Sequence, residues 1–321
     1  MSMEIKVKLV EDIELQQKRS GKPLRFVLKL YGISKSRWHS WFGKDGELLS
    51  PRGRPLKNDC ILPDEVAAVL AFREKHPDVG YRKLAWMLVD TDTAYLTESA
   101  VYTILSEHNR LNGWNKTGSD SAGKEYTSKP QHVHDHWHMD IAYIKIGDNF
   151  YFLIMMLDGY SRFLLDWDLM PDMLGSSVES FVQRVKDKYP EQQPRLITDN
   201  GSQFISVDFK RLVSNLQIKH IRTRRNHPET NGKIERLNSS VKSEAIRPNH
   251  PQSYQEACDT LNDYAYFYNY QRLHAGVNYL RPADMFFGRG DKILHERRNK
   301  IKLGRDLRIE QNKARKSSLI S

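Results

Sequence analysis

The sequence predicts an α/β protein whose core is a mixed five-stranded sheet flanked by helices, preceded by all-α domains. Three closely spaced apolar segments alternate as strands do, at 138–146, 149–157 and 162–169. Helical and strand patterns then take turns, with helices at about 174–188 and 206–215 and strands at 195–199 and 218–223. Hairpin-linked strands followed by this alternation are typical of a mixed sheet with helices on both faces.

Length and composition set the outer limits. A chain of 321 residues and 37.5 kDa, 39% hydrophobic, allows two or three domains with packed cores. No apolar run approaches the length of a membrane span, and the charged N-terminus has no signal-peptide pattern. We therefore expect a soluble cytoplasmic protein without a membrane partner. Cys60 and Cys258 fall in different expected domains, which disfavours a disulfide framework or a cysteine-rich zinc site.

The charge is concentrated at the two ends of the chain. The formal net charge is +10, with 13 Lys/Arg against 6 Asp/Glu in residues 1–57 and 11 against 4 in residues 289–321. Basic ends around a slightly acidic middle favour a polyanionic partner, although charged termini are also commonly just solvated. The expected segments are two helix-turn-helix domains at 1–48 and 61–112, a basic linker at 49–60, a flexible linker at 113–131, a core at 132–288 and a basic tail at 289–321.

The first segment predicts three helices between about 3 and 43. Pro23 opens the second helix, Gly32 ends it, and Ser34 caps the third. A helix-turn-helix would pack the aromatic side chains of the third helix inward and turn its polar side chains towards DNA. Those polar side chains belong to Lys35, Ser36, Arg37 and His39. An ordinary three-helix bundle fits the same pattern equally well.

Pro51 to Lys57 form an extended basic linker, because two prolines and a glycine disfavour helix. Its Arg-Gly-Arg-Pro core resembles an AT-hook, in which arginines enter a narrow minor groove. Arg52, Arg54 and Lys57 would then contact DNA. A solvated basic linker is an equally good interpretation.

A second three-helix unit is expected over 63–111. Asp64 is the expected cap of a helix that runs to about Lys75, Gly80 opens the next helix, and Thr97 caps the third. The histidines at 132, 134, 136 and 138 alternate along the strand that follows, but neighbours on one face of one strand seldom bind zinc alone.

Three carboxylates stand at positions that suit metal-assisted phosphoryl transfer. Asp140 lies within a strand, Asp199 lies at a strand tip, and Glu235 lies in the first turns of a helix with an apolar stripe. They are separated by 58 and 35 residues. Magnesium prefers carboxylate oxygens, and a pair of such ions activates the attacking oxygen and stabilises the leaving one.

Each carboxylate has an ordinary alternative. An Asp at a strand end usually forms a turn or cap, and a Glu beside basic residues on a helix is usually solvated. Asp158, Glu229 and Glu244 are the rivals. Asp158 precedes a turn sequence, Glu229 lies in a loop, and Glu244 lies nine residues beyond Glu235, too far along one helix to share its metal.

The three acids and their local strings resemble the DD(35)E signature of retroviral integrases and related bacterial insertion-sequence transposases. Asp140, Thr198-Asp199-Asn200-Gly201 and Asn231-Gly232-Lys233-Ile234-Glu235-Arg236 carry the resemblance, which extends over about 130–288. The string from Tyr268 to His274 resembles the insertion-sequence branch more closely. The resemblance implies a ribonuclease H-like fold, DNA strand transfer, and two Mg²⁺ or Mn²⁺ ions held by Asp140, Asp199 and Glu235.

The expected function is a DNA transposase or integrase that binds element ends, cleaves a strand and transfers it into target DNA. Phosphate contacts are expected from basic residues around the third acid, namely Arg224, Arg225, Lys233, Arg236 and Lys242. Double-stranded DNA, a homo-oligomer on that DNA and an accessory element-encoded protein are the expected partners, in the nucleoid of a bacterial cytoplasm. The alternatives are a DNA-binding regulator with an inactive core and a plain ribonuclease H-like nuclease.

Overall fold

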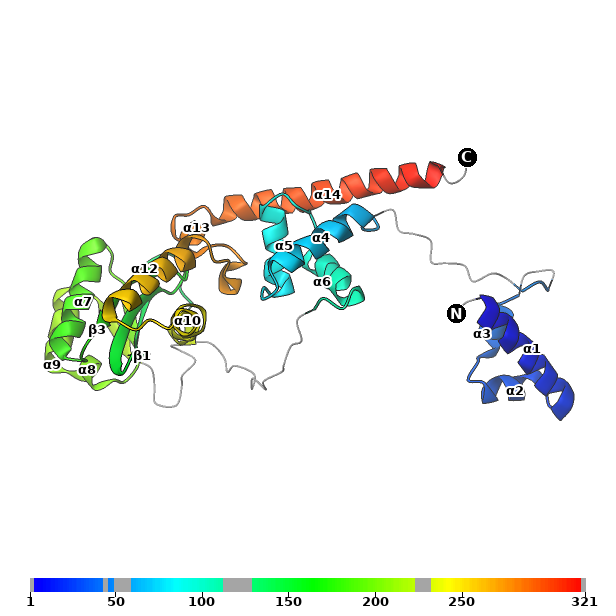
Figure 1. The fold of residues 1–321 in the computed structure, drawn as a ribbon, viewed down its shortest axis with the longest axis horizontal. Coiled ribbons are helices and arrows are strands. Elements are labelled where there is room, and N and C mark those ends of the chain that lie inside the picture. Colours follow the sequence, from blue (N-terminus) through cyan, green and yellow to red (C-terminus); the bar gives the residue numbers. More distant parts are fainter. Residues whose placement is uncertain (1–2, 43–45, 49–58, 112–128, 223–231, 319–321) are drawn as a thin grey trace. The chain divides into compact units, whose positions relative to one another are not determined.

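The computed structural model describes residues 3–42, 46–48, 59–111, 129–222 and 232–318 (Figure 1). Two compact units make up the chain: residues 1–61 with 306–321, and residues 62–305. Each is described separately. No helix in the described ranges combines the length and the apolar character needed to cross a lipid bilayer.

The first unit begins with three short helices, α1 (Met3–Ser20), α2 (Leu24–Leu30) and α3 (Lys35–His39). The hydroxyl oxygen of Ser34 accepts a hydrogen bond from the Arg37 N–H at 3.2 Å, so the expected cap is confirmed. The bundle core contains Val10, Ile13, Val27, Leu28, Trp38 and Trp41. The three-helix pattern is therefore confirmed at the level of elements, and the helix-turn-helix interpretation stays a prediction.

The third helix is shorter than expected. The three helices were expected to extend to about residue 43, but α3 ends at His39. Ile5 of α1 and Phe26 of α2 are apolar, yet they are 53% and 49% exposed. The spacing of apolar residues does not show which of them a three-helix bundle buries, because the outer edge of the apolar stripe on each helix stays exposed to water.

The second unit opens with the α4–α6 bundle: α4 (Pro63–Lys75), α5 (Tyr81–Asp90) and α6 (Glu98–Glu107). Thr97 caps α6 as predicted, accepting from the Ala100 N–H at 3.3 Å. The expected cap at Asp64 is wrong. Leu62 occupies the N-cap position of α4, and its N–H donates to the Glu65 carboxylate at 3.0 Å, which leaves Asp64 in the first turn.

The core expected at 132–288 is built on one five-stranded sheet. Its strands are β1 (His136–Ile146), β2 (Asn149–Asp158), β3 (Leu164–Met170), β4 (Arg195–Thr198) and β5 (Lys219–Arg222). Their order is β3-β2-β1-β4-β5. The first three strands pair antiparallel, whereas β4 is parallel to β1 and β5 is parallel to β4. The predicted mixed, ribonuclease H-like sheet is confirmed.

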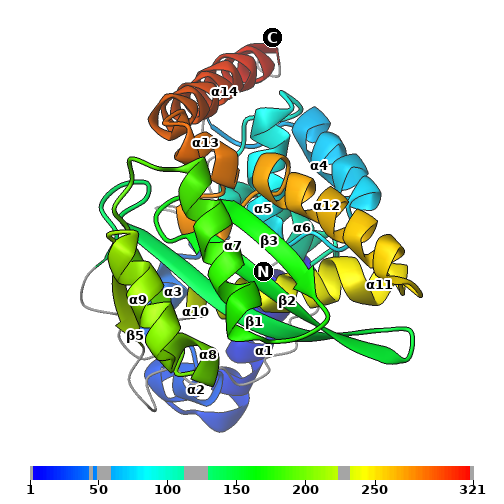
Figure 2. The same cartoon turned by 90° about the vertical axis from the view of Figure 1, so that its left-hand side faces the viewer.

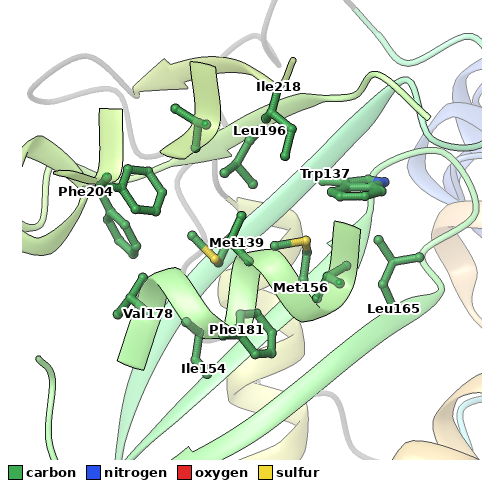
Figure 3. Packing of buried hydrophobic residues seen from close by; sticks show 14 of the residues in the cluster. Trp137, Met139, Ile154, Met156, Leu165, Val178, Phe181, Leu196, Phe204 and Ile218 are labelled. Carbon is green, nitrogen blue, oxygen red and sulfur yellow. The ribbon is translucent and has the colours of Figure 1, made fainter. Parts of the chain in front are cut away.

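Three helices cover one face of the sheet: α7 (Gly175–Lys188), α8 (Ser202–Ile205) and α9 (Val207–Asn215). Figure 2 shows them in front of the strands, and Figure 3 shows their apolar side chains packed against the sheet. This core includes Trp137 and Met139 from β1, Phe181 from α7, and Phe204 and Phe209 from α8 and α9. The sequence did not predict α8, which is only one turn long.

The opposite face is covered by α10 (Gly232–Val241), a π-helical turn η2 (Lys242–Ile246), α11 (Arg247–Asn249) and α12 (Tyr254–Tyr270). The side chain of Asn269 on α12 makes two hydrogen bonds to the backbone of β3, as the backbone of a neighbouring strand would. Its side-chain oxygen accepts from the Leu164 N–H at 2.8 Å, and its amide nitrogen donates to the Leu164 carbonyl at 3.0 Å. The last helix of this face is thereby fixed against the edge of the sheet.

The chain closes with η3 (Ala275–Val277), α13 (Pro282–Phe286) and α14 (Gly290–Ser318). The basic tail expected at 289–321 is largely helical, and Leu303 and Leu307 on α14 are 51% and 44% exposed. In the second unit, Arg297 of α14 is only 3% exposed. Its guanidinium donates to both carboxylate oxygens of Asp90 on α5, at 2.8 and 2.6 Å, and to the carbonyls of Asn278 and Tyr279.

Arg297 therefore joins α14, the α4–α6 bundle and the loop before α13 in one contact. We expect Arg297→Ala to lower the free energy of unfolding by about 3 kcal/mol, because removal of one partner leaves a largely buried carboxylate and two carbonyls unpaired. Urea unfolding measures this. Arg298→Ala, which removes an exposed neighbour on the same helix, should change the value by less than about 0.5 kcal/mol; equal losses in both variants would contradict the role given to Arg297.

Candidate active site

Asp140 and Asp199 come together because β1 and β4 are neighbouring parallel strands. The paired residues are His136 with Arg195 and His138 with Ile197. Two further residues in this register bring Asp199, just past the end of β4, beside Asp140. Neighbouring strands lie about 4.8 Å apart, and residues paired in a parallel ladder project to the same face. The Asp199 carboxylate also accepts from the Gly201 N–H at 2.9 Å, which fixes the turn into α8.

Glu235 is brought to the same place by α10. The apolar stripe of this helix, Ile234, Leu237 and Val241, is buried against the sheet. On the adjacent side, the Asn238 amide donates to Asp140 Oδ2 at 2.7 Å. Glu235 precedes Asn238 by three residues, so the two side chains lie on the same side of the helix. The hydrogen bond thus sets Glu235 close to the strand edge that carries both aspartates.

Burial and electrostatic repulsion among the three carboxylates raise the pKa of two of them, Asp140 and Glu235. Partial burial, together with the negative charges of Asp199 and Glu235, raises the pKa of Asp140 to about 6, although the Ile141 N–H and Asn238 act in the opposite direction. Loss of hydration and the charge of Asp199 also raise the pKa of Glu235. The carboxylates therefore concentrate negative charge at this edge of the sheet. Their repulsion lowers the stability of the fold, and a bound cation would remove that effect.

The donor set suits a hard divalent cation, because it consists of carboxylate oxygens from two strands and one helix. Within the described residues, no group of three or more His, Cys, Asp or Glu side chains that could hold a metal ion is present.

The rival carboxylates have other partners. Glu244 accepts two hydrogen bonds from the Arg272 guanidinium, at 2.8 and 2.6 Å, and one from the Tyr264 hydroxyl. Buried Asp158 accepts from the His134 N–H and from both the N–H and the hydroxyl of Ser161, so it organises the turn that the sequence predicts there. Glu229 lies outside the described residues.

The predicted DNA-contacting residues fall into two described groups. Lys35, Ser36, Arg37 and His39 are all exposed on α3. On α10, Arg236 is exposed and Lys233 is half-buried, and Lys242, the first residue of η2, is also half-buried. The remaining candidates, Arg52, Arg54, Lys57, Arg224 and Arg225, lie outside the described residues.

Asn238 is a site residue that the sequence analysis missed. The signal was available, since position 238 follows Glu235 by one helical turn and is polar beside an apolar stripe. Its side chain is 9% exposed, and its amide oxygen has no hydrogen-bond partner in the described part of the chain. The buried Asn238 amide donates to Asp140 and therefore positions that carboxylate.

Comparison with known proteins agrees with this geometry. Two models of the integrase core domain match, over residues 130–228 and 216–282. The transposase for insertion sequence element IS904 of Lactococcus lactis is 28% identical over 152 residues, which is 46% of this chain and 59% of that protein. A putative integrase of a Spiroplasma virus is 27% identical over 150 residues, 42% of this chain and 41% of that protein. The matches thus span about half the length of these relatives.

Solved structures of retroviral proteins are also similar. The HTLV-2 integrase catalytic core domain in complex with magnesium matches with a TM-score of 0.39 and 17% identity, over 49% of this chain and 98% of that one. A simian T-cell lymphotropic virus intasome chain matches with a TM-score of 0.45 and 16% identity, over 68% and 74%.

The sheet order and the two family-model matches define an integrase core domain within the second unit. Its first strand carries Asp140, and its matched segment continues through α10 and α12. The match over residues 130–282 supports a relationship of this domain to DDE transposases and retroviral-type integrases.

The raised pKa of Asp140 makes a prediction about stability. Between its ordinary value of 3.8 and about 6, the folded chain holds a proton on Asp140 that the unfolded chain has lost. This group's contribution to the free energy of unfolding therefore falls as the pH rises through that window and stays low above it. We expect Asp140→Asn to remove this dependence and to be more stable than the natural protein at pH 7 without divalent cations.

Urea unfolding at several pH values, with and without Mg²⁺, measures both effects. Mg²⁺ should stabilise the natural protein more than Asp140→Asn. Asp208→Asn, which changes a carboxylate that is 75% exposed on α9, is the matched control and should follow the natural curve. Parallel pH curves for the natural protein and Asp140→Asn would show that Asp140 does not carry the shifted pKa.

Proposed function

We propose that this protein is a DNA transposase that binds the ends of a mobile element and catalyses divalent-metal-dependent strand cleavage and strand transfer into target DNA. One observation carries the proposal. The hydrogen bond from Asn238 to Asp140 joins α10 to β1 one helical turn from Glu235, and the β1–β4 pairing runs towards Asp199, which together support a site formed by these three acids. Three carboxylates from separate elements at one sheet edge are what two-metal phosphoryl transfer needs.

In this proposal, Asp140, Asp199 and Glu235 supply oxygen ligands for Mg²⁺ or Mn²⁺. Such ions lower the pKa of an attacking hydroxyl and stabilise the leaving oxygen. Asn238 orients the Asp140 carboxylate by holding one of its oxygens. Lys233, Arg236 and Lys242, together with Arg224 and Arg225, hold the DNA backbone beside the acids and place the scissile phosphodiester without specifying a sequence.

The proposed chemistry has two stages on one site. Water first attacks the phosphodiester at the element end, one P–O bond forms as another breaks, and a 3′-hydroxyl is released. That hydroxyl then attacks a phosphodiester of the target, again exchanging one P–O bond for another, and the strands are joined. Neither stage needs a covalent link to the protein, because attacking and leaving groups are both oxygens of water or DNA.

The partners follow from the same proposal. Lys35, Ser36, Arg37 and His39 on α3 would contact the element end, and Arg52, Arg54 and Lys57 the DNA beside it. Joining two ends requires at least two copies of the chain on the DNA, so a homo-oligomer belongs to the proposal, and an accessory element-encoded protein remains part of it.

Strand transfer in a purified system tests the proposed activity. With Mg²⁺ or Mn²⁺, a labelled duplex that carries the element end and a supercoiled target, we expect a joined product from the natural protein. Glu235→Gln should reduce that product by more than about 100-fold, since the amide lacks the charge that a metal ligand needs. Product formation is measured on a denaturing gel.

Asp263→Asn is the matched control, because it changes an exposed carboxylate on α12 of the same domain and should leave the product unchanged. Glu235→Gln with full activity would refute the assignment of the acids. DNA retardation by both proteins without any joined product would support instead a DNA-binding regulator with an inactive core.

A separate prediction concerns recognition of the element end by α3. We expect Arg37→Ala to weaken binding to the end duplex by about 10- to 100-fold, the range for one lost contact with a base edge, with a smaller effect on a scrambled duplex. Fluorescence anisotropy at fixed salt measures both affinities. Arg19→Ala removes an exposed arginine of α1 in the same bundle and should change both duplexes alike. Equal losses on both duplexes for Arg37→Ala would reduce its role to phosphate contact.

A further inference from the structure

Thr198, the residue directly before Asp199, is at the centre of a short chain of hydrogen bonds. Thr198 has no exposed surface, and its hydroxyl donates to the carbonyl oxygen of Asp199 at 3.0 Å. The same hydroxyl oxygen lies 2.9 Å from Nε2 of His220 on β5. A threonine hydroxyl has one proton to donate. With that proton on the Asp199 carbonyl, the imidazole Nε2–H is the donor of the second bond.

The imidazole is held in the orientation that this donation needs. The register of β4 and β5 pairs His220 with the residue two positions before Thr198, so both side chains lie on the same face of the sheet. The ring of buried Phe209 on α9 contacts the imidazole edge-on, with the ring centroids 5.3 Å apart. Burial and then the charges of Arg222 and Lys210 lower the pKa of His220 to about 4. The imidazole is therefore neutral at pH 7 and carries one N–H.

The backbone and the side chain of Asp199 are held by different groups. Its carbonyl oxygen accepts from Thr198, whereas its carboxylate accepts from the Gly201 N–H at 2.9 Å. The charge of that carboxylate contributes to the raised pKa of the other two acids of the proposed site, so the side chain lies towards them. His220 packs instead against Phe209, which belongs to the core beneath α7–α9. The imidazole thus supports Asp199 from the face of the sheet opposite α10.

We propose that His220 is a positioning residue for Asp199, because through the Thr198 hydroxyl it fixes the backbone from which that carboxylate projects. The proposal rests on the proposed function, which makes Asp199 a ligand of Mg²⁺ or Mn²⁺. Groups that hold a metal ligand in place set its orientation, and their removal typically weakens metal binding by about 10- to 100-fold. Neither His220 nor Thr198 would touch the ion or the DNA.

Mn²⁺ binding to the full-length protein tests the hydroxyl without depending on catalysis. Free Mn²⁺ is measured by electron paramagnetic resonance during a titration. We expect Thr198→Val to raise the dissociation constant about 10-fold, since valine has a similar shape but no proton to donate. Thr198→Ser keeps the hydroxyl and should bind Mn²⁺ as the natural protein does. Thr260→Val, which removes a hydroxyl that donates to the Glu256 carbonyl on α12, is the matched control and should leave the constant unchanged.

A second pair of variants tests the imidazole, and it decides the matter if Thr198→Val does not fold. His220 is only half-buried, so the fold should accept both changes. His220→Leu removes the donor and should raise the Mn²⁺ dissociation constant about 10-fold. His220→Gln retains an N–H at the end of its side chain and should recover most of the affinity. A thermal midpoint that falls in His220→Leu while the Mn²⁺ affinity stays natural would assign the contact to folding alone and overturn the proposal.

Asp199→Asn separates this proposal from the proposed function. Weaker Mn²⁺ binding in Asp199→Asn, with natural affinity in Thr198→Val and His220→Leu, would overturn the positioning role and leave the transposase proposal standing. Natural Mn²⁺ affinity in Asp199→Asn, or a natural protein that binds no Mn²⁺, would overturn the assignment of Asp199 as a ligand and the positioning role with it.

Discussion

The packing of α10 on β1 is the contact on which the rest of the site depends. Ile234, Leu237 and Val241 bury one stripe of this helix against the sheet, and each such side chain contributes about 1.5–3 kcal/mol when fully buried. Because the stripe fixes the rotation of the helix, the positions beside it have little freedom. Glu235 and Asn238 are therefore aimed at the strand edge by hydrophobic burial, and the single hydrogen bond to Asp140 refines an orientation that apolar contacts have already chosen.

The same arrangement also lowers the stability of the fold. A carboxylate at the end of a sheet next to an apolar helix loses hydration, and neighbouring carboxylates repel it, which is why the pKa of Asp140 rises. These carboxylates lower the stability of the free protein, and the two apolar cores on either face of the sheet offset that cost. Concentrations of one sign of charge at the edge of a well-packed domain are typical of sites built for a charged ligand.

Much of this architecture could be predicted from local signals. Alternation gave all five strands to within two residues, and the caps at Ser34 and Thr97 were correct because each depends on a hydroxyl and the next turn of backbone. The cap expected at Asp64 was a local error, because Leu62 occupies the N-cap position and its N–H donates to the Glu65 carboxylate. The other features that failed depend on distant residues. The burial of Arg297, the pairing of Asn269 with β3 and the role of Asn238 each need a partner at least 98 positions away or from another element, and no periodicity records such a partner.

The π-helical turn at Lys242–Ile246 has a consequence for how this region tolerates change. An α-helix advances by about 100° per residue, and a π turn takes up one additional residue, so it shifts the phase of everything that follows. Upstream of it, Glu235 faces the strand edge; within it, Glu244 faces Arg272. One continuous helical segment thereby directs two carboxylates towards two different sides. Insertion or deletion of a single residue there would rotate Glu235 relative to Glu244. This segment should therefore tolerate single-residue insertions and deletions less well than substitutions.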